Sequence, residues 1–125
     1  MDFDYKDKRY RSSKIVNGIT MAGPRAHLRG LGLLDEELKK PFVAVINTFN
    51  EMHPGHVHLN RLAQLVKDGV REAGGVPFEV NTISICDGFG QGNEGMCHAL
   101  PSREIIADSI ECYTGGHQVD GMVLI

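Results

Sequence analysis

The stretch PFVAVINTF, residues 41–49, decides how the rest of the sequence is interpreted. Most of its residues are apolar, several are β-branched, and a proline precedes them. Strands that are covered on both faces, as in a parallel sheet, have sequences of this kind. Residues 41–49 therefore predict a buried strand.

Helices and strands are predicted to alternate after this first strand. Apolar residues recur every three or four positions between 57 and 73, which predicts an amphipathic helix that ends at Gly74-Gly75. PFEVNTISI, 77–85, predicts a second strand, and Ser102 is predicted to begin a second helix. DGMVLI, 120–125, predicts a third strand. The buried side of the second helix is expected to carry Ile105, Ile106, Ile110 and Tyr113.

The order β-α-β-α-β predicts an α/β fold, a parallel sheet with flanking helices and right-handed crossovers. Ligands of such sheets bind at the carboxyl ends of the strands. The third predicted strand is the last segment of the sequence, and an uncovered apolar strand invites association. We therefore expect the chain to be a truncated part of the N-terminal domain of a larger protein.

The segment before the first strand divides into two parts. Residues 1–20, with eight charged residues among the first fourteen, predict a polar N-terminal arm that is disordered alone or ordered by a partner. Residues 21–125 would form the incomplete α/β domain. MAGPRAHLRGLGL, 21–33, predicts a short helix with Arg25 and Arg29 on one face, which is equally explained as a solvated basic face.

The composition excludes several classes of protein. The 125 residues carry a net charge of −3 and a pI of about 6.0, which gives no basic footprint for nucleic acid. No apolar run approaches the roughly 18 residues of a membrane span, and the charged start is unlike a secretory signal, so we expect a cytoplasmic protein. Three cysteines without C-x-x-C spacing predict free thiols: Cys86, Cys97 and Cys112.

The loop CDGFGQGNEG, 86–95, carries the G-x-G-x-x-G spacing of dinucleotide-binding loops. Four residues separate the strand from Gly90, Pro101 limits the helix expected next, and Glu94 would repel a phosphate. The spacing therefore does not indicate a nucleotide. Asp87 is instead either an oxygen ligand for Mg²⁺ or the carboxylate of an Asp-Gly turn that accepts backbone N–H groups. Cys86 is interpreted as a small buried residue.

The loop after the first strand contains His53, His56 and His58. Without thiolate or carboxylate partners at ligand spacing, they do not predict a zinc site. The alternatives are hydrogen bonding to an anionic ligand at the helix N-terminus and capping of that turn.

Several motifs, in the same order, resemble the N-terminal region of the dihydroxy-acid dehydratase and 6-phosphogluconate dehydratase family. The similarity runs from about Arg11 to Ile125. The motifs are MAGPRAHLRGLGL (21–33), PFVAVINTFNE (41–51), PGHVHL (54–59), REAGGVPFEVNTISICDG (71–88), NEGM (93–96) and LPSREIIADSIE (100–111).

The resemblance implies part of a two-domain enzyme that converts a 2,3-dihydroxy carboxylic acid into a 2-oxo acid with an iron-sulfur cluster, [2Fe-2S] or [4Fe-4S], and Mg²⁺. Asp87 matches the first Mg²⁺ ligand of the family. Some members have a cysteine cluster ligand where this sequence has Gly55, so the resemblance assigns no cluster ligand to this chain. His56 and His58 lie near that loop and are expected close to the cluster or the substrate.

The resemblance leaves the substrate and the assembly open. A dihydroxy acid of branched-chain amino-acid biosynthesis is expected, with an aldonic (sugar) acid as the alternative, because DGFGQGNEGMCHAL, 87–100, departs from the familiar forms of the amino-acid enzymes. The resemblance implies a homodimer or homotetramer for the full-length protein. The family's second cluster ligand, modified lysine and serine base lie beyond this segment, so we expect the isolated chain to be inactive. A non-catalytic interaction fragment is the alternative of a different class.

Overall fold

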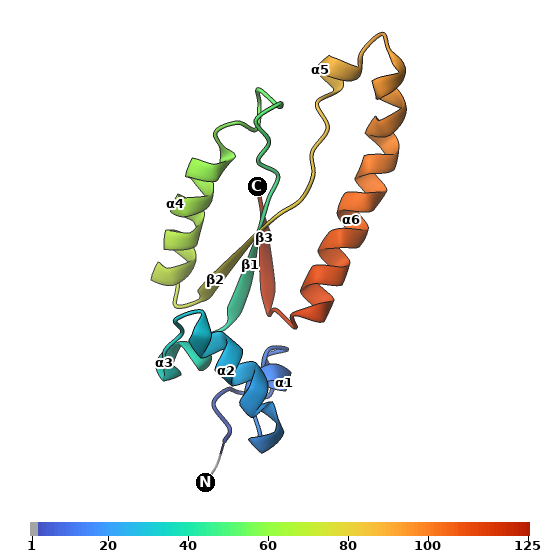
Figure 1. Ribbon diagram of the computed structural model, residues 1–125. Helices are drawn as coiled ribbons and strands as arrows, with labels where there is room; N and C mark the ends of the chain where they lie inside the picture. The colour runs from blue at the N-terminus through green and yellow to red at the C-terminus, as the bar shows by residue number, and fades with distance from the viewer. Residues whose placement is uncertain (1–2) are drawn as a thin grey trace.

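The computed structural model, which describes residues 3–125, has a three-stranded parallel sheet at its centre (Figure 1). The strands are β1 (Phe42–Asn47), β2 (Val76–Asn81) and β3 (Gly121–Leu124), in the order β2-β1-β3. The register pairs Ala44 with Phe78 on one side and with Met122 on the other. The predicted α/β fold with a parallel sheet is confirmed.

Two long helices flank the sheet, α4 (Leu59–Glu72) and α6 (Ala99–Gly116), and Figure 1 shows them on opposite sides of it. Ala44 and Ile46 form an apolar cluster with Val119, against which Ile110 and Tyr113 of α6 pack. Side chains alternate along a strand, so Val45 points to the other face, where α4 packs against β1 and β2. This two-sided burial explains the continuous apolar run.

The second predicted helix begins earlier than expected. Helix α6 starts at Ala99 rather than at Ser102, because Pro101 lies in its first turn, where no backbone N–H is needed for the helix. Of the four residues predicted to be buried, Ile105 is 57% exposed, which corrects that prediction. Ile106, Ile110 and Tyr113 are half-buried.

Short helical turns make up most of the remaining structure. Helices α1–α3 lie around the amino ends of the strands, and α5 and η2 lie beyond their carboxyl ends (Figure 1). None of the helices in residues 3–125 has the length and apolarity needed to cross a membrane. The bounds are α1 (Ser13–Val16), η1 (Ile19–Met21), α2 (Ala22–Gly30), α3 (Asp35–Leu38), α5 (Asp87–Gly90) and η2 (Glu94–His98).

The N-terminal segment differs from the predicted arm, because residues 3–20 fold onto the sheet. Val16 is fully buried in an apolar cluster with Leu38, Phe42 and Val76. Some polar side chains of this segment are buried, and others face solvent. No local pattern in the sequence indicates this, because Asp120, which accepts hydrogen bonds from Ser12, lies 108 residues further along the chain.

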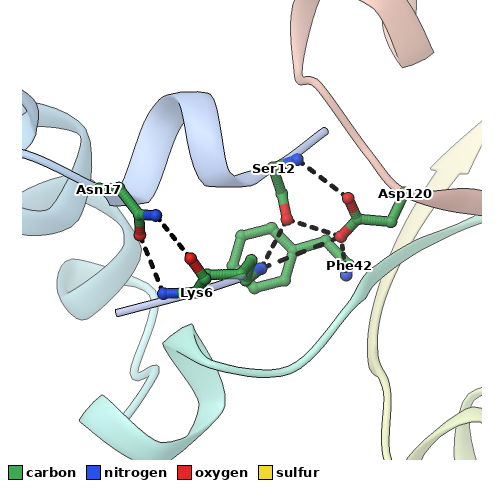
Figure 2. A network of polar contacts seen from close by, with 5 residues as sticks. All are labelled: Lys6, Ser12, Asn17, Phe42 and Asp120. Atoms are coloured by element: carbon green, nitrogen blue, oxygen red, sulfur yellow. Dashed lines mark hydrogen bonds and ion pairs between the residues drawn. The ribbon is translucent and has the colours of Figure 1, made fainter. Parts of the chain in front are cut away.

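Figure 2 shows the polar network that holds this segment. The Asp120 carboxylate accepts hydrogen bonds from Ser12 N (2.9 Å), Ser12 Oγ (2.6 Å) and Phe42 N (2.7 Å). The buried Lys6 ammonium donates to Ser12 Oγ (2.6 Å), lies 3.9 Å from Asp120 and sits 3.4 Å from the centre of the Phe42 ring. Asn17 holds the Lys6 backbone through two hydrogen bonds.

The basic face predicted for α2 does not exist as a solvated surface. Arg25 is only 4% exposed, and its guanidinium donates to the carbonyl oxygens of Val16 and Gly18, both at 2.6 Å. Arg29 pairs with Asp35 on the surface at 2.6 Å. The two arginines therefore have separate structural roles, one tying α1 to α2 and one at an exposed ion pair.

Replacing Asp120 by Ala should destabilise the chain strongly. The change leaves Ser12 and Phe42 N–H groups without acceptors and Lys6 without its counter-charge, so we expect a loss of about 3–5 kcal/mol of unfolding free energy. Urea unfolding followed by circular dichroism measures it. Asp68→Ala, which breaks only an exposed pair with Arg71, should cost less than about 1 kcal/mol. Equal effects of the two changes would contradict the assignment.

The stability of the fold should depend on Lys6 at alkaline pH. Burial lowers the pKa of Lys6 from 10.5 to about 8, against the opposing attraction of Asp120. Between these values the unfolded chain keeps a proton that the folded chain has released, so the unfolding free energy should rise with pH, by on the order of 3 kcal/mol. In Lys6→Met this increment should be missing. An identical pH profile in the variant would contradict the prediction.

Candidate functional site

The segments that follow β1 and β2 are tied together beyond the carboxyl ends of the strands, where the C-terminus also lies (Figure 1). Thr48 donates through its backbone N–H and its hydroxyl to the Ile125 carbonyl, at 3.0 and 2.9 Å. Ser84 Oγ donates to the Thr48 carbonyl at 3.0 Å, and Asn50 Nδ2 donates to the Ser84 carbonyl at 2.8 Å. These hydrogen bonds fix both loops relative to the sheet.

A cavity of about 310 Å³ lies between these loops and the start of α6. It brings together two of the three residues predicted for the site, Asp87 and His56, whereas His58 is exposed and is not part of its lining. The lining consists of Thr48, His56, Ser84, Ile85, Asp87, Ala99, Leu100, Ser102, Arg103 and Ile106.

Asp87 is the first residue of α5 and is exposed to the cavity. No hydrogen bond or ion pair within residues 3–125 engages its carboxylate. In particular, no backbone N–H of the Asp87-Gly88 turn donates to it, so the turn interpretation lacks its defining contact. The carboxylate is available to a ligand.

Metal binding at this position needs more ligands than Asp87. The described part of the chain holds no group of three or more His, Cys, Asp or Glu side chains that could bind a metal ion by itself. Mg²⁺ fits a single carboxylate best, because it is commonly held by one or two carboxylates with water and substrate oxygens. The three cysteines are free, as predicted, but they form no ligand set for an iron-sulfur cluster within residues 3–125.

His56 is held in one orientation by its neighbours. Its Nδ1 lies 2.9 Å from the Thr48 carbonyl oxygen, and because a carbonyl can only accept, Nδ1 carries the proton. In the neutral ring, Nε2 is then the atom with a free lone pair. The ring also stacks on His53, with 3.7 Å between ring centres. His58, the residue before α4, makes no side-chain capping hydrogen bond, so the capping interpretation fails for it.

The glycines of residues 86–95 pack the loop against itself. A Cβ atom on Gly90 would lie 2.9 Å from Met96 N and 3.0 Å from the Gly95 carbonyl carbon, which only a glycine avoids. The long helix begins at Ala99, nine residues after Gly90, so the first glycine does not sit at a helix N-terminus as a dinucleotide loop requires. Close packing within the loop explains Gly90 and Gly95, and a positive φ of 82° explains Gly92, so the G-x-G-x-x-G spacing has a structural cause.

The structure adds features that the sequence did not single out. Arg103 lines the cavity from the second turn of α6. A second cavity, also about 310 Å³, shares Ser84 and Ile85 with the first and has a largely apolar wall that includes Met52 and Phe89. In the sequence, Arg103 lies two residues after Pro101. Its closeness to the expected start of the helix was the signal that could have indicated a place in the site.

The comparisons with known proteins agree on one family. Residues 40–125 match the family described as dihydroxy-acid/6-phosphogluconate dehydratase N-terminal. Dihydroxy-acid dehydratase 1 of Methanosarcina acetivorans is 55% identical over 115 residues, which cover 92% of this chain and 21% of that protein. The dihydroxy-acid dehydratases of Desulfitobacterium hafniense and Pyrococcus abyssi are 53% and 52% identical, over 91% and 92% of this chain and 20% and 21% of theirs.

This chain thus spans about a fifth of the length of the curated relatives that it matches. The family match covers more than half of the chain and includes both loops that line the cavity. The chain belongs to the dihydroxy-acid/6-phosphogluconate dehydratase family.

Proposed function

We propose that this chain forms one wall of the active site of a hydro-lyase that removes water from a 2,3-dihydroxy carboxylic acid to give a 2-oxo acid. The observation that carries the proposal is the unengaged Asp87 carboxylate, which shares a cavity with His56 at the carboxyl ends of the strands. Relatives named dihydroxy-acid dehydratase support the reaction. The rest of the site would come from the remaining four fifths of such an enzyme.

Asp87 is proposed to hold Mg²⁺ through a carboxylate oxygen, and the other ligands would come from outside residues 3–125. An iron-sulfur cluster, [2Fe-2S] or [4Fe-4S], is proposed for the complete enzyme without a ligand from this chain. These groups would supply Lewis acidity, which helps a hydroxyl to leave and a carbon-bound proton to be removed.

The residues of this chain have roles of binding and orientation in the proposal. His56, with its proton on Nδ1, can accept a hydrogen bond from a substrate hydroxyl at Nε2. Thr48 and Ser84 use their hydroxyl hydrogens to fix the loops. Ile85, Leu100 and Ile106 give the cavity an apolar part. His58 does not line the cavity, so it is proposed to lie near the substrate or the cluster without contacting either.

The second cavity favours an alkyl-substituted substrate. Two of its polar side chains are already engaged: the Asn50 amide donates to the Ser84 carbonyl and accepts from Met52 N, at 2.8 Å each, and Ser84 Oγ donates to the Thr48 carbonyl. His98 also lines this cavity, and no hydrogen bond within residues 3–125 engages its side chain. An apolar wall suits a branched alkyl group, whereas an aldonic acid would need hydrogen-bonding partners for its extra hydroxyls. A role in branched-chain amino-acid biosynthesis, in a cytoplasmic homodimer or homotetramer, completes the proposal.

A hybrid dehydratase tests the reaction and its substrate. In it, the 115 matching residues of this chain replace those of the Methanosarcina acetivorans enzyme. We expect turnover of 2,3-dihydroxyisovalerate, with kcat/KM at least about tenfold above that for any of a panel of aldonates, because a buried hydroxyl without a partner is costly. Preference for an aldonate would support the sugar-acid alternative, and a folded hybrid without any turnover would leave only a non-catalytic role.

Replacing Asp87 by Asn in the hybrid should remove a Mg²⁺ ligand. The concentration of Mg²⁺ needed for half-maximal activity should rise at least about tenfold, since even indirect partners of metal ligands have effects of that size. Magnesium titrations of activity measure it. Asp108→Asn, at an exposed position of α6 outside the cavity lining, is the matched control and should change nothing. Unchanged magnesium dependence in Asp87→Asn would disprove the metal role.

A further inference from the structure

Arg103 gives the cavity its permanent positive charge. Among the residues of the described chain that line this cavity, it is the one lysine or arginine. No hydrogen bond or ion pair formed by residues 3–125 engages its guanidinium. Arg9, Arg25, Arg29 and Arg71 each have a partner within residues 3–125, whereas Arg11 and Arg61 have none there but lie outside the cavity lining.

The other side-chain donors in the cavity are already used by backbone carbonyls. Thr48 Oγ1 donates to Ile125 O at 2.9 Å, and Ser84 Oγ donates to Thr48 O at 3.0 Å. Ser102 Oγ donates to Ala99 O at 2.7 Å, and His56 uses its Nδ1 proton on Thr48 O. A hydroxyl has one hydrogen to donate. An anion that enters the cavity therefore finds its side-chain donors on Arg103.

Asp87 and Arg103 leave space for a ligand between them. They line the same cavity, yet none of the ion pairs within 4.0 Å in residues 3–125 joins them. The first turn of α6 also lines the cavity at Ala99 and Leu100, so the positive end of that helix dipole adds to the charge of Arg103. One side of the cavity suits a cation and the other suits an anion.

We propose that Arg103 binds the carboxylate of the substrate and so sets the orientation of its hydroxyl groups toward Asp87 and His56. A guanidinium presents paired N–H donors that match the two oxygens of a carboxylate. The inference rests on the proposed function, which supplies a substrate with a carboxylate. It assigns Arg103 as a binding residue. It also gives the substrate a direction in the cavity, with the substrate carboxylate on the side of α6.

The hybrid dehydratase with Arg103→Gln tests this role. Loss of a charge-assisted contact should raise KM for 2,3-dihydroxyisovalerate by roughly 10- to 100-fold, with a smaller change in kcat. Arg103→Lys should recover part of the loss, because it keeps the charge but not the paired donors. The parent hybrid should be inhibited by 2-hydroxyisovalerate far better than by its amide, and Arg103→Gln should lose that preference.

Arg71→Gln is the matched control, because Arg71 is an exposed arginine whose partner is Asp68 and it does not line this cavity. It should leave KM and the inhibitor preference unchanged. An unchanged KM in Arg103→Gln, or a fall in kcat and thermal stability without a change in KM, would overturn the assignment.

Separate experiments test the dehydratase activity and the role of Arg103. A parent hybrid that folds but turns over no dihydroxy acid counts against the function alone. The folded hybrid then decides on Arg103, through the ligand-induced shift of its melting temperature, measured for the parent and for Arg103→Gln with Mg²⁺ present. A shift with 2-hydroxyisovalerate and none with its amide, lost in Arg103→Gln, supports carboxylate binding, whereas no shift, equal shifts, or a shift kept in Arg103→Gln contradicts it.

Discussion

The contact on which the rest of the structure depends is the Asp120 carboxylate. It accepts two hydrogen bonds from Ser12 and one from the backbone of Phe42, and the Asp120 N–H donates back to the Phe42 carbonyl at 2.8 Å. One side chain thereby joins the N-terminal segment, the start of β1 and the turn before β3. Buried groups of this kind are costly to leave unpaired, so the joint fixes where both strands begin.

The stabilising contacts and the candidate site lie at opposite ends of the same sheet. The Asp120 joint, the buried Arg25 and the apolar cluster around Phe42 lie at the amino ends of the strands. The cavity lies at the carboxyl ends, where the side chains of Asp87 and Arg103 have no partner among residues 3–125. Fixing the strands at one end positions the loops at the other, and the unengaged groups there are the ones available to a ligand.

The sequence predicted the parts of the fold that depend on local patterns. The apolar run at 41–49 and the helical period at 57–73 gave β1 and α4 to within a few residues. The folded state of residues 3–20 and the burial of Arg25 could not be predicted, because both depend on partners that local patterns do not reveal. Asp87 and His56 were singled out by their places after strands together with the family resemblance, whereas Arg103 reaches the cavity through the early start of α6 at Ala99.

The most direct test of the central claim, that this chain supplies a metal-binding carboxylate opposite an anion-binding arginine, is a crystal structure of the hybrid dehydratase with Mn²⁺ in place of Mg²⁺ and 2-hydroxyisovalerate bound. The metal is located by its anomalous scattering. We expect Mn²⁺ in direct contact with an Asp87 carboxylate oxygen, and the ligand carboxylate within hydrogen-bonding distance of Arg103. A metal bound elsewhere, with Asp87 facing only solvent, would contradict the claim.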